Sequence, residues 1–419
     1  MNKMKRKITT LIFIISLGKI LIAQNNQLSL NTGYTTQSFY SMQNGELLNI
    51  SNQDWDLAFS TESFSSTIRT NDGKAVELYT YQSGDTSSWN SINNNDINNL
   101  PNLMLNTDTS WEYGAFDIHQ TGGFDYGWAI YNLQTHHLIG DSLFIIKTVN
   151  GNWKKLWIKN KILGDYQIKY SDLDGNNEID MNIEASNYTD KNFIYYSLDN
   201  NLIIDREPNK EDWDITFTKY MTLYPNQGTF TPYSVTGTLQ NYGVEVAQAD
   251  NISSPFTYTD YSLHSFSNTI NTIGFDWKVF QGSYVIEDDR CYFIRDKSDN
   301  IWRLTFVNFE GTSTGNIEFN TELIQTTAIK DLNSMNSFAI YPNPINQNKE
   351  LTLIYELNGH HTTAIVRIHD MHGKQVYVSE LKNHNLTSHT ISTKNLTKGI
   401  YMISINIDEK QETDRIVIN

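Results

Sequence analysis

Several kinds of residue are scarce in this sequence, and each shortage excludes a class of protein. Among the 419 residues there is one cysteine, Cys291, so no disulfide can form within the chain and stability must come from burial. Lysine and arginine total 31 against 47 acidic residues, a net charge of −16. This excludes the clustered positive surface that nucleic acids or anionic lipids require. The sequence has 23 glycines and 7 prolines, too few for a collagen-like or Pro-rich low-complexity chain.

The N-terminus has the pattern of a secretory signal peptide, which we place at residues 1–23. Basic residues between Lys3 and Lys7 precede a short apolar run, Leu11–Leu17, and Ala23 stands before a polar residue. The run is short for a membrane span, and an uncleaved N-terminal anchor is the alternative. Elsewhere no stretch approaches about 18 consecutive apolar residues. We therefore expect an exported chain without a transmembrane span.

One phrase of the sequence is repeated over a long distance. Asp54–Ser60 (DWDLAFS) recurs as Asp212–Thr218 (DWDITFT), and further markers follow in the same order. The period is far longer than the roughly 20–50 residues of solenoid repeats, so each copy is the size of a domain. The other matched markers include Tyr40-Ser41-Met42 with Tyr196-Ser197-Leu198, Phe144–Lys147 with Tyr292–Arg295, and Trp128–Tyr131 with Trp277–Phe280. The predicted domains are two tandem homologous copies, 28–190 and 191–328, a linker, 329–336, and a third domain, 337–419.

The local pattern is that of β-structure throughout. Trp55, Leu57 and Phe59 alternate with smaller or polar residues, which predicts that all three lie on one face of a strand. Asn-Gly and Asp-Gly turn signals separate the apolar runs, and sustained helical periodicity is scarce. The predicted fold is all-β, with two tandem β-rich domains and a small C-terminal Ig-like β-sandwich. Residues 84–110, rich in Asn and Ser, have the composition of a long loop.

After residue 337 the sequence consists of short alternating strands with a distinctive set of motifs. These are Tyr341-Pro342-Asn343-Pro344, Gly373, Gly399, Tyr401 and the closing Arg415–Ile418. In these residues the segment resembles the C-terminal sorting domain, type A, of type IX secretion substrates in the Bacteroidetes. The resemblance implies export across the outer membrane, recognition by the type IX translocon, and release or surface anchoring after removal of the domain. An ordinary β-sandwich adhesion module is the alternative.

The repeated part carries a second set of motifs. They are the Trp-Asp-(Leu/Ile)-x-Phe strand, the segment Ile68–Gly73 after it, Trp128–Tyr131, and the hairpin from Phe144 to Leu156. In these motifs the repeats are similar to the HmuY family of exported haem-binding proteins. The second copy keeps the Trp-Asp strand and the final hairpin but lacks a segment equivalent to Ile68–Gly73. The resemblance implies all-β domains that hold haem between loops through two axial side chains.

Axial ligation of haem needs a neutral imidazole or a thioether on each side of the iron, within an apolar cleft. In the first copy, His136 and His137 lie about where the resemblance places one axial ligand. Met104, upstream, and His119, between the two, are the candidates for the other. The alternatives are a solvated histidine pair and a core-filling methionine. In the second copy the aligned position is near Tyr284, so any haem site there is degraded or different.

A weaker candidate for metal binding is the segment containing Asp172, Asp174 and Asn176. Calcium takes several oxygen ligands from closely spaced carboxylates and amides. The spacing is not that of an EF-hand, however, because the glycine comes too early and no glutamate stands at the twelfth position. The alternative is a polar β-turn rich in Asp, Asn and Gly.

Two other groups of reactive residues have both a catalytic and a structural interpretation. Asp54 and Asp56, repeated as Asp212 and Asp214, have the composition of a glycosidase pair. Nothing in the sequence supplies the burial that would separate their pKa values, and their repetition favours a structural motif. Cys291 lies in a predicted strand, which favours a buried thiol over a nucleophile.

We expect an exported, non-catalytic ligand-binding protein, and the resemblance implies that the ligand is haem. The alternative is a surface adhesion or glycan-binding protein with the same fold and no haem. Trp89, Trp111, Tyr126 and Trp128 lie near Asn-rich loops and would stack on sugars if exposed, whereas burial in the cores is the structural interpretation. A secreted hydrolase ranks last, because no catalytic constellation emerges.

Overall fold

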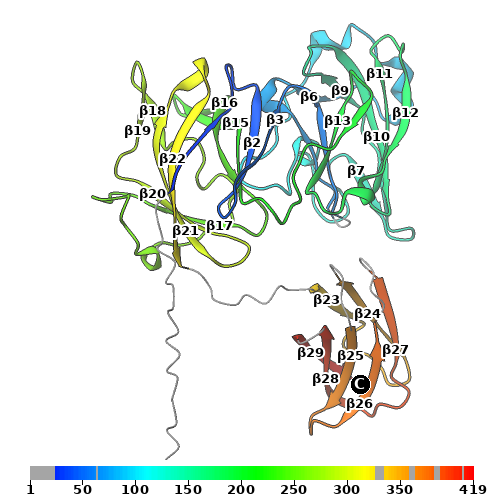
Figure 1. The fold of residues 1–419 in the computed structure, drawn as a ribbon. Coiled ribbons are helices and arrows are strands. Elements are labelled where there is room, and N and C mark those ends of the chain that lie inside the picture. Colours follow the sequence, from blue (N-terminus) through cyan, green and yellow to red (C-terminus); the bar gives the residue numbers. More distant parts are fainter. Residues whose placement is uncertain (1–23, 63–64, 326–334, 358–363, 382–386, 408–409) are drawn as a thin grey trace, which may run out of the picture. The chain divides into compact units, whose positions relative to one another are not determined.

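The computed structural model of the chain describes residues 24–62, 65–325, 335–357, 364–381, 387–407 and 410–419 (Figure 1). The predicted signal peptide and most of the predicted linker lie outside these residues. The chain divides into two compact units, residues 1–327 and 328–419. About 50% of the residues are in strands and 7% in helices, which confirms the predicted all-β class. The helices are short 3₁₀ turns: η1 (Asp72–Lys74), η2 (Thr86–Ser91), η3 (Asp96–Asn99), η4 (Ala115–Asp117), η5 (Ala185–Tyr188), η6 (Tyr261–Leu263) and η7 (Gly311–Ser313).

The larger unit contains two lobes, and lobe 1 comprises residues 52–205. Its strands are β4 (Leu57–Ser60), β5 (Ile68–Thr70), β6 (Glu77–Thr80), β7 (Ala129–Asn132), β8 (His137–Gly140), β9 (Phe144–Lys147), β10 (Trp153–Ile162), β11 (Asp165–Asp172), β12 (Ile179–Ile183), β13 (Phe193–Ser197) and β14 (Leu202–Ile204). One sheet has the order β12-β11-β10-β8-β7, with β9 and then β6 also paired alongside β10. The second sheet has the order β14-β13-β4-β5.

Lobe 2 comprises residues 24–51 and 206–325. Its strands are β1 (Gln24–Ser29), β2 (Thr36–Ser41), β3 (Gly45–Ser51), β15 (Ile215–Asn226), β16 (Thr229–Gln240), β17 (Glu245–Ala249), β18 (Lys278–Phe280), β19 (Tyr284–Ile286), β20 (Cys291–Arg295), β21 (Ile301–Phe309) and β22 (Asn316–Gln325). The sheet orders are β1-β22-β21-β20-β17 and β16-β15-β2-β3, with a separate β18-β19 hairpin. The two lobes therefore share one strand plan.

Each lobe is completed by strands from the other sequence repeat. In lobe 1, β4 of the first repeat pairs with β13 of the second, and in lobe 2, β15 of the second repeat pairs with β2 of the first. At the edge of the large sheet, β1 from the start of the described chain pairs with β22 of the second repeat, whereas β12, at the same place in lobe 1, pairs with β11, the strand before it. Figure 1 shows the blue β2 beside the green β15. The lobes therefore divide the chain differently from the predicted domains 28–190 and 191–328.

Aspartates of the repeated phrase hold the exchanged hairpins in place. In lobe 1 the Asp56 carboxylate accepts hydrogen bonds from the backbone N–H groups of Leu198, at 2.8 Å, and Val149, at 2.7 Å. In lobe 2 the Asp214 carboxylate accepts from the N–H of Met42, at 2.6 Å. Burial raises the pKa of each of these two carboxyl groups to about 6. These contacts are the structural role that the repetition of the aspartates favours.

The second repeat keeps part of the segment that we expected it to lack. In lobe 1 the Asn71 side-chain amide donates to the backbone carbonyl of Trp55, at 3.0 Å. In lobe 2 the Asn241 amide donates to the carbonyl of Trp213, at 2.7 Å. Asn241 and the glycine two residues later thus repeat the Asn-x-Gly of the first copy. The second copy thus lacks the Arg-Thr part of that segment, as expected, but keeps the Asn-x-Gly that shapes the turn.

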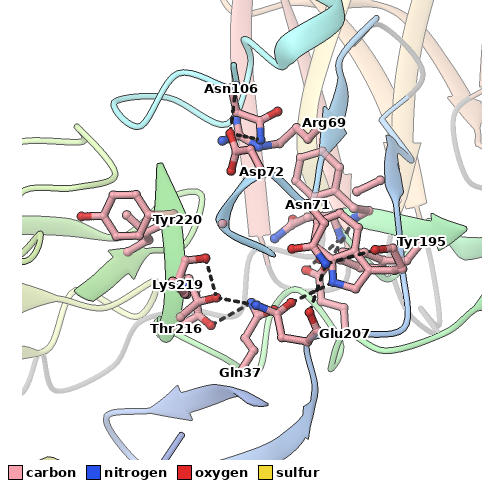
Figure 2. A pocket seen from close by; sticks show the side chains of 18 of the residues that line it. Gln37, Arg69, Asn71, Asp72, Asn106, Tyr195, Glu207, Thr216, Lys219 and Tyr220 are labelled. Atoms are coloured by element: carbon pink, nitrogen blue, oxygen red, sulfur yellow. Dashed lines mark hydrogen bonds between the residues drawn. The ribbon is translucent and has the colours of Figure 1, made fainter. Parts of the chain in front are cut away.

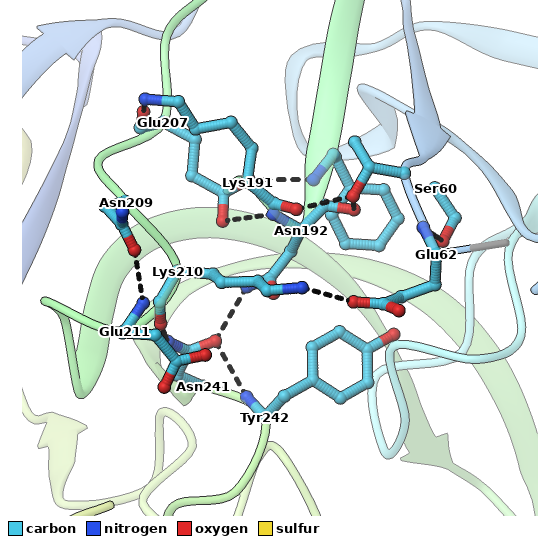
Figure 3. Close-up of polar contacts among 12 residues, drawn as sticks. Ser60, Glu62, Lys191, Asn192, Glu207, Asn209, Lys210, Glu211, Asn241 and Tyr242 are labelled. Carbon is cyan, nitrogen blue, oxygen red and sulfur yellow. Dashed lines mark hydrogen bonds and ion pairs between the residues drawn. The ribbon is translucent and has the colours of Figure 1, made fainter. Parts of the chain in front are cut away.

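The joint between the lobes is polar and close (Figure 3). Lys210 of lobe 2 forms an ion pair with Glu62 of lobe 1, at 2.6 Å. The Asn192 amide of lobe 1 donates to the side-chain oxygen of Asn241 in lobe 2, at 2.7 Å. A Cβ atom on Gly73 would lie 2.1 Å from a carbonyl oxygen of β15, so only glycine allows the backbones to approach this closely.

Each lobe buries an apolar core between its two sheets. The largest fully buried side chains include Trp128 in lobe 1 and Trp277 in lobe 2, at the positions that the repeat aligns. Trp128 donates to the carbonyl of Ser66, at 2.9 Å, which satisfies the indole N–H. Cys291 of β20 is buried, and burial raises the pKa of its thiol to about 11, as expected for a structural thiol.

The smaller unit is a sandwich of two sheets, with orders β23-β24-β27 and β26-β25-β28-β29. Its strands are β23 (Met335–Tyr341), β24 (Glu350–Leu357), β25 (Ala364–Asp370), β26 (Gln375–Glu380), β27 (Thr387–Ser392), β28 (Gly399–Ile407) and β29 (Lys410–Ile418). Leu353 of the first sheet and Val366 and Ile403 of the second belong to one core. Because β23 begins at Met335, the last two residues of the predicted linker are in a strand.

The predicted sorting motifs join the two ends of this sandwich. The Asn343 side chain donates to the carbonyl of Arg415, at 2.7 Å, and accepts from the N–H of Val417, at 3.0 Å. It therefore ties the segment after β23 to the last strand, β29. Tyr341, next to it, is exposed, whereas Tyr401 is buried and donates its hydroxyl to a backbone carbonyl at 2.9 Å.

Candidate functional site

The structure places the predicted axial ligands of haem in different settings. His136 is exposed at the turn between β7 and β8 and its Nδ1 lies 2.7 Å from the Tyr131 hydroxyl. His137 is half-buried at the start of β8, and His119 is exposed. Met104 is buried in the core of lobe 1, where its sulfur accepts from a threonine hydroxyl at 3.1 Å. A thioether that is buried and already accepts a hydrogen bond does not fit an axial ligand of haem.

The calcium-loop candidate forms a closed turn between β11 and β12. Asp172 accepts from Lys154, at 2.9 Å, and from the Asn177 amide, at 2.7 Å. Both oxygens of Asp174 accept from Asn176, from its backbone N–H and from its side-chain amide, each at 2.9 Å. These carboxylates are thus engaged as turn acceptors. Among the described residues, no group of three or more His, Cys, Asp or Glu side chains is arranged to hold a metal ion.

The four aromatic residues that we expected near the Asn-rich loops are covered to different degrees. Trp89 and Trp128 are buried, and Tyr126 packs against the core of lobe 1. Trp111 is half-buried, and its indole N–H donates to the carbonyl of Gln240 in lobe 2, at 2.8 Å. These side chains pack in the cores or in the joint between the lobes, so they do not form an exposed aromatic surface.

A cavity lies between the two lobes (Figure 2) and holds about 620 Å³ of atom-free space, part of it open to solvent. Trp55 faces it, although the alternation predicted that Trp55 shares a face with Leu57 and Phe59. That prediction is wrong, because β4 begins only at Leu57. Leu57 and Phe59 enter the core of lobe 1, while Trp55 packs edge-on against Tyr195, with ring centroids 4.9 Å apart. The other lining residues include Gln37, Arg69, Asn71, Asp72, Asn106, Trp111, Glu207, Trp213 and Lys219.

The charged groups around this cavity bind one another and the backbone. Arg206 donates to the Gln37 side-chain oxygen at 2.8 Å, and its guanidinium lies over Trp55 and Tyr195. Arg69 donates to the carbonyls of residues 107 and 110, at 2.8 and 2.9 Å. Glu207 accepts from two backbone N–H groups and from an indole, and burial raises its pKa to about 7. Most of the charge around the interlobe cavity is therefore bound within the joint, although Arg206 Nε and the hydroxyls of Thr70 and Tyr220 are buried without a hydrogen-bond partner.

Exposed aromatic residues gather instead at the tip of the β15-β16 hairpin of lobe 2. Residues 223–226 and 229–233 are exposed on both faces of the two strands. Tyr224 and Tyr233 are 47% and 59% exposed and their ring centroids lie 5.6 Å apart on one face. Phe230, 68% exposed, lies opposite Pro225 across the strands, on the other face. We call residues 223–233 the aromatic hairpin.

The aromatic hairpin has no counterpart in lobe 1, where the equivalent strands β4 and β5 have only 4 and 3 residues. β15 and β16 have 12 residues each. The sequence contains a signal for this hairpin. Residues 220–244 contain no charged residue, in a chain in which 19% of the residues are charged. A long uncharged stretch with exposed aromatic side chains is typical of an interaction surface.

Residues 339–419 match the family described as the secretion system C-terminal sorting domain. They form a type IX sorting domain, so the protein is exported and is either secreted or attached to the cell surface. Within the described residues, no helix is long and apolar enough to cross a membrane.

No curated protein matches the chain. Among solved structures, a polysaccharide lyase is 7% identical over 88% of this chain, with a TM-score of 0.17. The chain spans 40% of the length of that protein. A likeness this low carries no argument about fold or function, and the similarity of the repeats to the HmuY family stays a prediction.

Proposed function

We propose that this exported protein is a non-catalytic glycan-binding protein that attaches to neutral polysaccharides through the aromatic hairpin of lobe 2. The observation that carries the proposal is an exposed, uncharged pair of strands with Tyr224 and Tyr233 side by side on one face. Tyrosine and phenylalanine offer rigid apolar faces that stack on the C–H faces of sugar rings, and tyrosine adds a hydroxyl for hydrogen bonding.

Charge also favours a neutral ligand. The protein has a net charge of −16, so acidic polysaccharides and nucleic acids are repelled. The hairpin itself provides neither the cations that an acidic glycan needs nor the anions that a basic protein needs. Thr229 and Thr231 stand exposed among its aromatic residues, and their hydroxyl oxygens suit hydroxyl-rich ligands.

Haem binding has less support from the geometry. An iron ligand must be exposed to an apolar cleft, whereas Met104 is 2% exposed and its sulfur already accepts a hydrogen bond. The lining of the interlobe cavity contains no histidine, methionine or cysteine. Its Tyr195 phenol has a pKa raised by burial, so it stays protonated and is a poor iron ligand.

A non-catalytic role is supported by the way the buried carboxylates are used. Asp56, Asp214 and Glu207 have raised pKa values, which is a frequent property of catalytic acids. Each of them, however, accepts hydrogen bonds from backbone N–H groups. These bonds fix the strand exchange and the joint, and they leave the carboxylates little freedom to serve a substrate.

The proposal is tested by co-sedimentation of the purified protein with insoluble cellulose, chitin, xylan and mannan. We expect at least one polysaccharide to retain the protein, and the Tyr224→Ala/Tyr233→Ala variant to bind about 10-fold or more weakly, since each aromatic contact contributes roughly 0.5–1.5 kcal/mol. The matched control is Ile130→Ala/Ile139→Ala, which removes an exposed cross-strand pair from lobe 1. Equal loss in both variants, or no retention, would refute the role of the hairpin.

A haemin titration discriminates the second candidate. The glycan proposal expects no Soret shift. A shift that disappears in the His136→Ala/His137→Ala variant would instead establish haem binding in lobe 1.

A further inference from the structure

The outer face of the large sheet, the face turned away from the lobe core, differs between the two lobes. In lobe 1 it is closed by side chains that pair with one another. Lys159 forms an ion pair with Asp180, at 2.8 Å, and Lys169 with Glu178, at 3.0 Å. Trp89 covers this face, is 5% exposed, and donates its indole N–H to Glu178, at 2.9 Å. No polar group in this set is left for a ligand.

The register of the strands identifies the equivalent positions in lobe 2. Asp180 lies opposite Lys169 between β12 and β11, and Asn25 lies opposite Asn320 between β1 and β22. The β-bulge of β10 at position 159 recurs in β21 at Val307. The ion-pairing residues of lobe 1 are thus replaced in lobe 2 by amides and a valine.

These replacements leave a groove on lobe 2. It holds about 890 Å³ of atom-free space, part of it open to solvent. Phe256, 44% exposed, is one of its lining residues. The loop that carries Phe256 is held on the sheet by Arg303, which donates to the Phe256 carbonyl and to that of Tyr258. The remaining lining residues are Asn25, Asn26, Gln27, Val307, Glu318, Phe319 and Asn320.

Four of the five polar side chains that line this groove are uncommitted, whereas Asn26 donates to the Gln24 carbonyl and to the Thr321 hydroxyl. Asn25, Gln27, Glu318 and Asn320 have no side-chain hydrogen bond or ion pair within the described part of the chain, and the side-chain oxygen of Asn320 is buried without a partner. A buried acceptor of this kind costs free energy until a donor reaches it. The groove therefore offers one unpaired buried acceptor, two further amides and one carboxylate between apolar walls.

From this arrangement we infer that the groove of lobe 2 is a second saccharide-binding site, which takes a short chain of a neutral oligosaccharide. Side-chain amides present a donor and an acceptor together and match the neighbouring hydroxyls of a sugar ring. The Glu318 carboxylate accepts from further hydroxyls, and Phe256 and Val307 cover the apolar face of the ring. The inference rests on the proposed function for the class of ligand, but it uses none of the residues of the aromatic hairpin.

An extended peptide fits the groove less well. Peptides that add to a sheet bond along the backbone of an edge strand and place alternate side chains in pockets. Here the unpaired groups are side chains on the face of the sheet, above β1 and β22. A peptide ligand is therefore kept as an outcome of the test.

The experiment is isothermal titration of the purified protein with soluble cello-, xylo-, manno-, malto- and chito-hexaose. We expect one or more of these to bind, and Gln27→Ala/Asn320→Ala and Phe256→Ala each to weaken that binding at least 10-fold. The matched control is Asn182→Ala, which lies at the position of Gln27 in lobe 1 and should leave the affinity unchanged. A second variant, Asn25→Asp/Val307→Lys, rebuilds the ion pair of lobe 1 across the groove and should also abolish binding.

The outcomes separate the two sites. Binding that is lost only in Tyr224→Ala/Tyr233→Ala overturns this inference and leaves the proposed function intact. Hexaose binding that is lost only in the groove variants supports the inference and leaves the role of the aromatic hairpin to the co-sedimentation test. If no hexaose binds, or if the groove variants lose only the binding of peptides from a random library, the inference is overturned.

Discussion

The two lobes of this protein share a strand plan, a strand register and an aspartate that holds an exchanged hairpin, yet they use their surfaces differently. Lobe 1 closes the outer face of its large sheet with Trp89 and two ion pairs. Lobe 2 leaves a groove at the same place, with Phe256 half-exposed, and extends one hairpin into solvent. The comparison teaches that the shared elements are those that join the lobes, while the groove and the aromatic hairpin, which we propose as binding surfaces, are found on lobe 2.

The largest effect is expected from removing residues 24–51. Lobe 2 would lose the edge strand β1 and the β2-β3 hairpin, whose removal leaves β15 and β22 unpaired on one side. The expected loss exceeds the whole stability of a domain, about 5–15 kcal/mol. Hydrogen exchange should show lobe 2 unprotected while peptides from lobe 1 stay protected. If lobe 2 stayed protected from hydrogen exchange in this variant, the conclusion that residues 24–51 complete lobe 2 would be contradicted.

The next effect distinguishes the two outer faces. Trp89→Ala should destabilise the protein by about 4 kcal/mol, because it removes a buried indole and exposes the surface beneath. Phe256→Ala, at the corresponding cover of lobe 2, should cost less than about 1 kcal/mol, since its ring is half-exposed. Urea unfolding of both variants measures the difference. Equal costs would show that the lobe 2 face is packed like that of lobe 1.

The lobes should also differ in their response to pH. A carboxyl group whose pKa is raised on folding holds its proton more tightly when folded, so stability falls as pH rises towards the folded pKa. Burial raises the pKa of Asp117 in lobe 1 to about 8, against about 6 for Asp214 and about 7 for Glu207 in lobe 2.

Lobe 1 should therefore keep losing stability up to about pH 8, whereas the loss in lobe 2 should end near pH 7, each group contributing about 1.4 kcal/mol per pH unit until its folded pKa is reached. Urea unfolding resolved by hydrogen exchange in each lobe, from pH 5 to 9, measures this. Asp117→Asn should flatten the profile of lobe 1 above pH 7. An unchanged profile would remove Asp117 as the cause.

The smallest effect concerns the ion pair that lobe 2 lacks. Asn25→Asp/Val307→Lys should change stability by no more than about 0.5 kcal/mol, because an exposed ion pair contributes little. Thermal unfolding at low and high salt measures the change. A stabilisation much larger than this would contradict the expectation that the two substituted side chains form an exposed ion pair.

The repeat and the all-β class could be predicted because they depend on local patterns, such as the recurrence of Asp54–Ser60. The strand exchange could not be predicted in the same way. β2 and β13 carry related sequences, Tyr40-Ser41-Met42 and Tyr196-Ser197-Leu198, so either hairpin would satisfy the edge of β4. Which hairpin pairs with β4 depends on the lengths of the connections and on the contacts in the joint between the lobes. The periodic pattern of apolar residues carries no information about either.

The site residues show a similar limit. Trp55 faces the interlobe cavity because β4 begins only at Leu57. Alternation assumes a strand that is already extended at Trp55. The histidine pair and Met104 were aligned by resemblance, which gives order along the chain but not convergence in space. The absence of charged residues from 220 to 244 is visible in the sequence. It would have pointed to the aromatic hairpin.

The strand exchange has a consequence for the order in which the strands can pair while the chain is being synthesised. Residues 24–51 emerge first, but their partners in lobe 2 emerge only after the whole of lobe 1. Lobe 1, being continuous, has all its strands before lobe 2 begins to close. β1 and β2 therefore stay unpaired on one side until β22 and β15 have been synthesised. A chain cut short before β22 keeps an uncovered strand edge that is prone to aggregation. Because the partner of β1 is the last strand of lobe 2, β1 can be paired only in a chain whose lobe 2 has been synthesised completely.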